Sequence, residues 1–160
     1  MKKILKRIAL LLLIVFIVMQ FFGPDKNVSE VAIKDNPSDF ITIEQPSAMV
    51  EGILVRACYD CHSNNTTYPW YNNITPVNYW MADHVAHGTK HLNFSEWGTY
   101  SPKKKDHKLE ECIEMVEEGE MPLNSYTWTH GDAKLTQAEI QELTTWLSLV
   151  RLKVQKQMPK

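Results

Sequence analysis

The sequence predicts an all-α fold of about four helices. Apolar residues recur at intervals of three and four positions in several separate segments, and the alternating pattern typical of half-buried strands is nearly absent. The chain has 160 residues, of which 44% are hydrophobic and 22% are charged. These proportions are close to those of a soluble globular domain, so we expect one packed domain and exclude wholesale disorder.

Residues 1–22 are expected to form a membrane helix. A basic cluster over residues 2–7 precedes the run Ile8–Phe22, whose only polar residue is Gln20. This pattern is typical of an export signal or a membrane anchor. The run is shorter than the roughly 20 residues that span a bilayer, but no small residues follow it as a cleavage site. We therefore favour an uncleaved transmembrane helix that anchors the chain in the cell membrane. The positive-inside rule then places the N-terminus in the cytoplasm and the rest of the chain in the periplasm.

The charge is unevenly distributed along the chain. The net charge is −2, from 17 Lys and Arg residues and 19 Asp and Glu residues. Because the first 22 residues contain four basic residues and no acidic one, the remainder has 13 basic and 19 acidic residues and a net charge of −6. A mildly acidic domain argues against a nucleic-acid-binding surface, so we expect no nucleic-acid partner.

Residues 23–39 are expected to be a tether, because prolines and polar residues interrupt any apolar periodicity there. The folded domain is expected to cover residues 40–157. Within it, Phe40–Ile43 is expected to pack on the domain as an extended segment.

The first two helices of the domain have recognisable starts. Ser47 can cap a helix whose apolar positions continue directly to Cys58. A second helix is expected from Pro76, since proline suits the first helical turn, and its apolar side extends to Leu92. A polar and aromatic loop, residues 63–75, separates the two.

The last two helices are bounded by caps. Asp106 is expected to begin the third helix and Gly119 to end it, after a loop over residues 98–105. Thr136 and Glu139 form a capping box at the start of the fourth. Long loops rich in Trp and Tyr favour a chain that wraps around a ligand.

The segment Cys58–His62 reads C-Y-D-C-H, which has the form C-x-x-C-H of c-type haem attachment. Thiols three residues apart can reach two vinyl groups on one edge of a porphyrin, and the adjacent imidazole can then turn beneath the iron. The chance expectation of this pattern is on the order of 0.002 per chain, so the motif is a specific signal. We predict one covalent haem c, with Cys58 and Cys61 as attachment sites and His62 as the proximal iron ligand.

A second axial ligand is expected from Met or His residues farther along the chain. Met121 is the best candidate, because it lies between Gly119, which ends a helix, and Pro122, which holds the chain extended. Packing against the last helix is the alternative role for this side chain. His84, on the apolar side of the second helix, is the rival ligand.

The order of helix, C-x-x-C-H, long loop, Met-Pro loop and closing helix resembles cytochrome c. A closer resemblance, over residues 40–151, is to the bacterial haem-binding domain family of Bacteroidetes-type exported proteins. This resemblance implies a cytochrome c-like fold and covalent haem binding, with His62 as proximal ligand and Cys58 and Cys61 as thioether sites. It implies no defined physiological role. The segments that carry it are residues 58–64, 68–74, 76–77, 91–97 and 121–128.

Aromatic residues are candidates for the wall of the haem pocket. Trp70, Trp80, Trp97 and Trp128 could pack on the porphyrin, whose large apolar faces need such neighbours, or could form an ordinary core. Tyr126 or Trp128 is a candidate hydrogen-bond donor to a propionate.

Three histidines and one cysteine can be explained by ordinary structural roles. His84, His87 and His91 follow a spacing that can gather a metal ion, but such spacing is more often simply amphipathic. Cys112, on the apolar side of the third helix, is expected to pack as a small hydrophobic residue.

The function that these features favour is a monohaem c-type cytochrome that carries single electrons between redox partner proteins outside the cytoplasmic membrane. We find no acid–base pair, nucleophile triad or phosphate loop, so we do not expect an enzyme. A haem-based sensor or ligand-binding module is the main alternative. A thiol-redox pair and a zinc site built from Cys58, Cys61, His62 and a distant histidine are less favoured.

Overall fold

The computed structural model describes residues 1–158, which form eight α-helices and four short 3-10 helices. Within these residues there is no β-sheet, and strand-like pairing is limited to an isolated bridge between Val28 and Asn65. The predicted all-α class is therefore confirmed. The 3-10 helices lie at Ile33–Asp35, Trp70–Asn73, Phe94–Thr99 and Gly131–Ala133.

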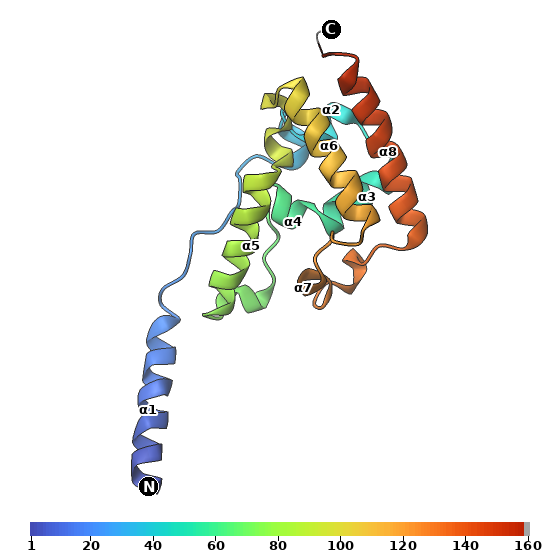
Figure 1. The fold of residues 1–160 in the computed structure, drawn as a ribbon. Helices are drawn as coiled ribbons and strands as arrows, with labels where there is room; N and C mark the ends of the chain where they lie inside the picture. The colour runs from blue at the N-terminus through green and yellow to red at the C-terminus, as the bar shows by residue number, and fades with distance from the viewer. Residues whose placement is uncertain (159–160) are drawn as a thin grey trace.

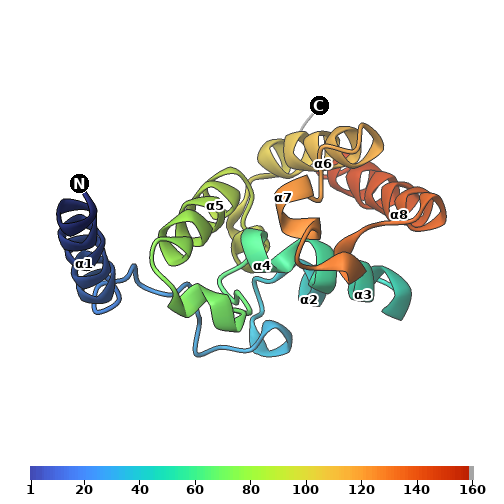
Figure 2. The same ribbon diagram turned by 90° about the horizontal axis from the view of Figure 1, so that it is seen from below.

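Helix α1, Lys2–Met19, projects away from the rest of the molecule (Figures 1 and 2). None of its residues is buried. Across the described range 1–158, no helix combines the length and the apolar character needed to cross a membrane, so the expected transmembrane helix over residues 1–22 is not supported. The reason is that α1 includes the basic cluster, which leaves only about 12 consecutive apolar residues, or about 18 Å of helix against a hydrocarbon core of about 30 Å.

The segment after α1 lies against the loop that follows the C-x-x-C-H motif. The Asn27 side-chain amide donates to the Ser63 carbonyl at 2.7 Å, and the Asn27 backbone N–H donates to the Tyr68 hydroxyl at 2.9 Å. Farther back, the Gln20 side chain exchanges two hydrogen bonds with the Thr75 backbone, at 2.9 and 3.2 Å. Part of the predicted tether is thus fixed to the domain.

Helix α2, Phe40–Glu44, occupies the segment expected to be extended, so that expectation is wrong. The Asp39 carboxylate accepts a hydrogen bond from the Ile41 N–H at 2.9 Å and caps this short helix. Because Phe40 is fully buried against Phe94 and Trp97, tertiary packing favours a helical turn over the extended form that the β-branched residues prefer.

Two consecutive helices deliver the motif. Helix α3, Ala48–Ala57, begins with the Ser47 side chain accepting from the Val50 N–H, as predicted. Helix α4, Tyr59–His62, follows at once, with Cys58 at the junction. The C-x-x-C-H motif therefore starts at the C-terminal end of α3, a helix whose N-terminus is capped by Ser47.

Helices α5 and α6 lie on either side of α4 (Figure 1). Helix α5, Val77–His91, starts after Pro76 as expected. Helix α6, Pro102–Glu117, starts five positions earlier than expected: Ser101, in place of Asp106, is its N-cap and Pro102 its first residue. Asp106 lies inside this helix, where its carboxylate accepts from Arg151 at 2.8 Å instead of capping.

The chain closes with helix α7, Asn124–Thr127, and helix α8, Gln137–Gln155. The predicted capping box of Thr136 and Glu139 is present at the start of α8. Helix α8 packs alongside α6 in both views, and its buried residues join Phe40, Phe94 and Trp97 in one core (Figures 1 and 2). This core lies next to the motif, since Tyr59 stacks on Phe94 at 5.1 Å between ring centroids.

Candidate cofactor site

A cavity of about 800 Å³ lies between α4, α5, α6 and α7. Its volume is within the usual range of ligand and cofactor sites. The lining is mainly apolar, with Leu54, Leu143 and Leu147 contributed by α3 and α8. All five residues predicted as attachment sites or axial ligands line this cavity: Cys58, Cys61, His62, His84 and Met121.

The two thiols of the motif are held by regular backbone geometry. The Cys58 carbonyl accepts from the N–H groups of Cys61 and His62 at 3.2 and 3.0 Å, which places both cysteines on one helical turn. Burial raises the pKa of the Cys58 thiol to about 12 and that of the Cys61 thiol to about 11. Both are therefore neutral thiols near pH 7, and both are free in this structure.

The His62 ring is oriented by a backbone carbonyl. Its Nδ1 lies 3.1 Å from the Leu92 carbonyl oxygen, and because a carbonyl only accepts, Nδ1 must carry the proton. Burial lowers the pKa of His62, so the ring is neutral and its Nε2 lone pair is available. Phe94 contacts the ring edge-on, at 6.2 Å between centroids. This arrangement is typical of a histidine that ligates a metal through Nε2.

Met121 reaches the cavity from the loop after α6. Gly119 ends that helix with a φ of +74°, a conformation that favours glycine. The N–H groups of Glu120 and Met121 then donate to the Met115 carbonyl at 2.9 and 3.0 Å, so the loop is fixed to the last turn of α6. Met115 itself also lines the cavity and is a thioether that the sequence did not single out.

His84 remains a possible ligand by geometry. Its Nδ1 lies 2.8 Å from the Trp80 carbonyl oxygen and donates to it, so Nε2 is the ring nitrogen that takes no part in this hydrogen bond. Its ring packs against the Trp80 indole at 4.5 Å. The cavity therefore offers an imidazole on α5 as well as the Met121 thioether.

Gly88 is a site residue that sequence reasoning did not identify as such. A Cβ built at this position would lie 2.2 Å from the Cys61 carbonyl oxygen and 3.1 Å from the Cys61 Cβ. Only glycine therefore allows α5 to pack directly on the second cysteine. A glycine on the apolar side of a predicted helix is the one signal in the sequence that points to such a close approach.

The two residues between the cysteines each form a tyrosine–carboxylate hydrogen bond. The Tyr59 hydroxyl donates to the buried Asp39 carboxylate at 2.7 Å, and the Tyr126 hydroxyl donates to the Asp60 carboxylate at 2.7 Å. Burial raises the pKa of Asp39, whose second oxygen has no hydrogen-bond partner in the described structure. The motif is thus tied on one side to the start of α2 and on the other to α7.

None of the four tryptophans that were candidates for packing on the haem lines the cavity. Trp97 is buried in the core, where its indole N–H donates to Glu44 at 3.0 Å. Trp70 and Trp128 are 76% and 80% exposed, and Trp80 is half-exposed. The walls are instead formed by aliphatic, sulfur-containing and histidine side chains, together with Phe94 and Tyr126.

The rim of the cavity is polar and carries both signs of charge. Lys108 lines it and forms a 2.6 Å ion pair with Glu111 on the same helix. His84, His87 and His91 of α5 also line it. Nowhere in residues 1–158 are three or more His, Cys, Asp or Glu side chains arranged to hold a metal ion.

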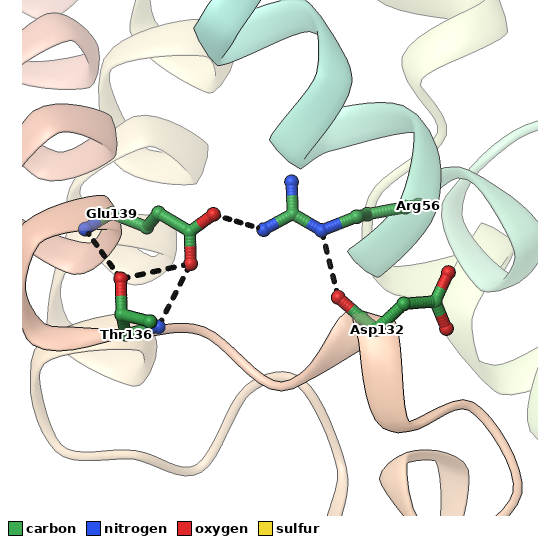
Figure 3. A network of polar contacts seen from close by, with 4 residues as sticks. All are labelled: Arg56, Asp132, Thr136 and Glu139. Atoms are coloured by element: carbon green, nitrogen blue, oxygen red, sulfur yellow. Dashed lines mark hydrogen bonds and ion pairs between the residues drawn. The ribbon is translucent and has the colours of Figure 1, made fainter.

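A network at the end of α3 links the motif to α8 (Figure 3). The Arg56 guanidinium donates to the Asp132 carbonyl at 2.8 Å and pairs with the Glu139 carboxylate. Glu139 also accepts from the Thr136 backbone N–H at 2.9 Å, and these contacts lower its pKa. Arg56, two residues before Cys58, is thus fixed to the start of the closing helix.

Comparison with known proteins gives one match. The model of a family described as "Haem-binding domain" matches residues 14–149, which is most of the chain. No curated protein and no solved structure matches. The matched range contains the motif, Gly88, Met121 and the greater part of α8.

Proposed function

We propose, since the chain belongs to the haem-binding domain family, that it is a monohaem c-type cytochrome that carries single electrons between redox partner proteins. The observation that carries this proposal is the meeting of two thiols, one oriented imidazole and one thioether on the wall of a single cavity. Soft sulfur and imidazole donors around an apolar space fit a haem, both as attachment sites and as axial ligands.

In this proposal each residue has a separate role. Cys58 and Cys61 hold the porphyrin through thioether bonds, and His62 supplies the proximal ligand through Nε2. Met121 supplies the distal ligand, which favours the ferrous state and raises the potential relative to a second imidazole. When bound, haem supplies reversible one-electron exchange at its iron. The chain excludes water from the apolar wall and fixes the ligand orientations.

We also propose that the haem domain lies outside the cytoplasmic membrane, in the periplasm. The basic cluster followed by an apolar run at the N-terminus supports export of the chain. A cysteine pair of this kind is a site of haem attachment in that compartment, where free thiols otherwise oxidise to disulfides.

The decisive experiment is expression together with a haem-attachment system. We expect the full chain to gain the mass of one haem, to stain for haem on a denaturing gel, and to show a reduced-minus-oxidised difference spectrum. Replacing both Cys58 and Cys61 by Ser should abolish the mass gain. A red pigment that acid-acetone extracts, or colourless protein despite competent maturation, would refute covalent attachment.

The distal ligand is assigned by separate substitutions. We expect Met121→Ala to alter the spectrum of the oxidised protein and to allow carbon monoxide to bind the reduced protein, with His84→Ala and Met115→Leu as comparisons. Carbon monoxide binding to the unmodified reduced protein would instead favour the haem-sensor alternative.

A further inference from the structure

The contact between Asp60 and Tyr126 joins two parts of the site that are far apart in sequence. The Tyr126 hydroxyl donates to one oxygen of the Asp60 carboxylate at 2.7 Å, and the Thr67 backbone N–H donates to the other at 2.9 Å. Asp60 lies between the two cysteines, and Tyr126 lies in α7. Hydrogen bonds to a carboxylate are stronger than those between neutral groups.

Tyr126 is joined to Met121 by a short and well-ordered stretch of backbone. The N–H groups of Tyr126 and Thr127 donate to the Leu123 carbonyl at 3.0 and 3.1 Å, which closes α7 immediately after Pro122. The other end of the stretch is held by the Met115 carbonyl, which accepts from the Met121 N–H. The Met121 loop is therefore fixed to α6 at its start and, through Tyr126, to the attachment motif at its end.

The Tyr126 hydroxyl also lies 3.3 Å from the Arg56 carbonyl oxygen, and its shorter contact is the one with Asp60. Burial and the adjacent Asp60 raise the pKa of Tyr126, so the hydroxyl remains a donor. Its ring stacks on His130 at 4.2 Å, which orients it toward the motif. In the described part of the chain, this is the only side-chain hydrogen bond between α7 and α4.

We propose that Tyr126 is a positioning residue for the distal ligand. By holding α7 on Asp60, it keeps the Met121 loop at a fixed separation from the haem-attaching cysteines and so keeps the distal side closed to outside ligands. This inference rests on the proposed haem function, but the Tyr126–Asp60 hydrogen bond, called the tie below, is a contact between residues of this chain. Asp60, which accepts the hydrogen bond from Tyr126, is then also a positioning residue of the site.

The test compares Tyr126→Phe with Tyr71→Phe in the haem-loaded full chain. Tyr71 is the matched control, because its hydroxyl donates to the Thr129 hydroxyl at 3.0 Å, beside α7 but away from the motif. For Tyr126→Phe we expect haem mass unchanged, imidazole binding to the oxidised protein increased about tenfold, and amide exchange over residues 121–128 accelerated about tenfold. For Tyr71→Phe we expect changes below about twofold.

A double-mutant cycle with Asp60→Ala tests whether Tyr126 and Asp60 act through their shared hydrogen bond or independently of each other. If Tyr126 acts through Asp60, adding Tyr126→Phe to the Asp60→Ala variant should give no gain in imidazole binding or exchange rate beyond that of Asp60→Ala alone. Additive effects, unchanged values for Tyr126→Phe, or equal increases for Tyr71→Phe would each overturn the proposal.

Failure of the haem proposal would be distinguishable from failure of this one. A chain that gains no haem mass contradicts the proposed function. Amide exchange over residues 121–128 can still be measured on that protein, and it tests the Tyr126–Asp60 tie by itself.

Discussion

At the scale of single residues, the closeness of α5 to the motif depends on the absence of one side chain. Gly88 faces the Cys61 carbonyl so closely that any Cβ must displace one of the two helices. At Gly52, in the middle of α3, no atom beyond the neighbouring residues and the backbone of the helix itself lies within 4 Å of the corresponding position. A Cβ would therefore clash at Gly88 and is accommodated at Gly52, although both glycines lie in helices.

We expect Gly88→Ala to lower the free energy of unfolding by about 3 kcal/mol and to reduce haem incorporation, because overpacking would push α5 away from the motif. Gly52→Ala should raise it by about 0.5–1 kcal/mol through better helix propensity. For each variant, urea unfolding measures the free energy of unfolding, and the haem content per chain measures incorporation. Equal behaviour of the two variants would show that the predicted clash is relieved without cost.

The buried pair of Tyr59 and Asp39 leads to a second prediction at this scale. Removing the hydroxyl by Tyr59→Phe leaves the Asp39 carboxyl with only backbone donors, at a cost of about 1–3 kcal/mol. Burial raises the pKa of Asp39, and the Tyr59 hydrogen bond opposes that rise. The cost should therefore be larger at pH 7, where ionisation is favoured, than near pH 4. Urea midpoints at the two pH values test this, and a cost independent of pH would contradict it.

At the scale of elements, the contact of α3 with α8 depends on a polar network (Figure 3). The Thr136 cap and Arg56 share the Glu139 carboxylate, so one side chain both starts α8 and holds the end of α3. The capping contacts and Arg56 lower the pKa of Glu139 below its usual 4.5. The contribution of this carboxylate to stability is therefore complete above about pH 4.5 and is lost as the pH falls through the lowered pKa.

We expect Glu139→Gln to reduce the free energy of unfolding by about 1 kcal/mol at pH 7 and by less at pH 3, because Gln keeps the capping contact but loses the charge. Glu142→Gln, on an exposed position of the same helix, should have little effect at either pH. Chemical denaturation at both pH values is the measurement. A larger loss at pH 3 than at pH 7 would reverse the sign and exclude this account.

At the scale of the whole molecule, the protein has two apolar regions side by side. One is the packed core, which includes Phe40 of α2, Val150 of α8 and Trp97 of the 3-10 helix Phe94–Thr99. The other is the mainly apolar wall of the cavity. In a domain of this size, a large cofactor replaces a substantial part of the core.

Replacing both Cys58 and Cys61 by Ser should therefore lower the free energy of unfolding by several kcal/mol relative to the haem-loaded chain, since each large apolar side chain that haem covers contributes about 1.5 kcal/mol or more. Cys112→Ser is the control, because Cys112 lines the same cavity but lies outside the motif. It should retain the haem mass. If the double variant unfolded at the same urea concentration as the haem-loaded protein, the cofactor would contribute nothing to the fold.

Local signals explain which parts of the fold could be predicted. The caps at Ser47 and Thr136 were predictable because a cap and its helix are adjacent in sequence. Asp106 was misassigned as a cap because its partner, Arg151, lies on another helix. Ser101 followed by Pro102 was the true local signal for the start of α6.

The candidate site also has features that are local in the sequence and features that depend on distant contacts. The motif is contiguous, so its cysteines and histidine could be read directly. Whether a tryptophan faces the cavity depends on how helices and loops meet, and residue type alone does not determine this; none of the four candidates does. The roles of Gly88 and Tyr126 depend on contacts with the motif across 27 and 66 positions, which no local pattern encodes.

The hydrogen bonds between Gln20 and Thr75 have a geometric consequence. They fix the exit of α1 to the loop from which α5 starts. Helix α5 in turn places Gly88 against Cys61, and the Leu92 carbonyl that follows it against His62. The point at which the N-terminal helix leaves the domain is therefore tied to the helix that packs on Cys61 and precedes the carbonyl that orients His62.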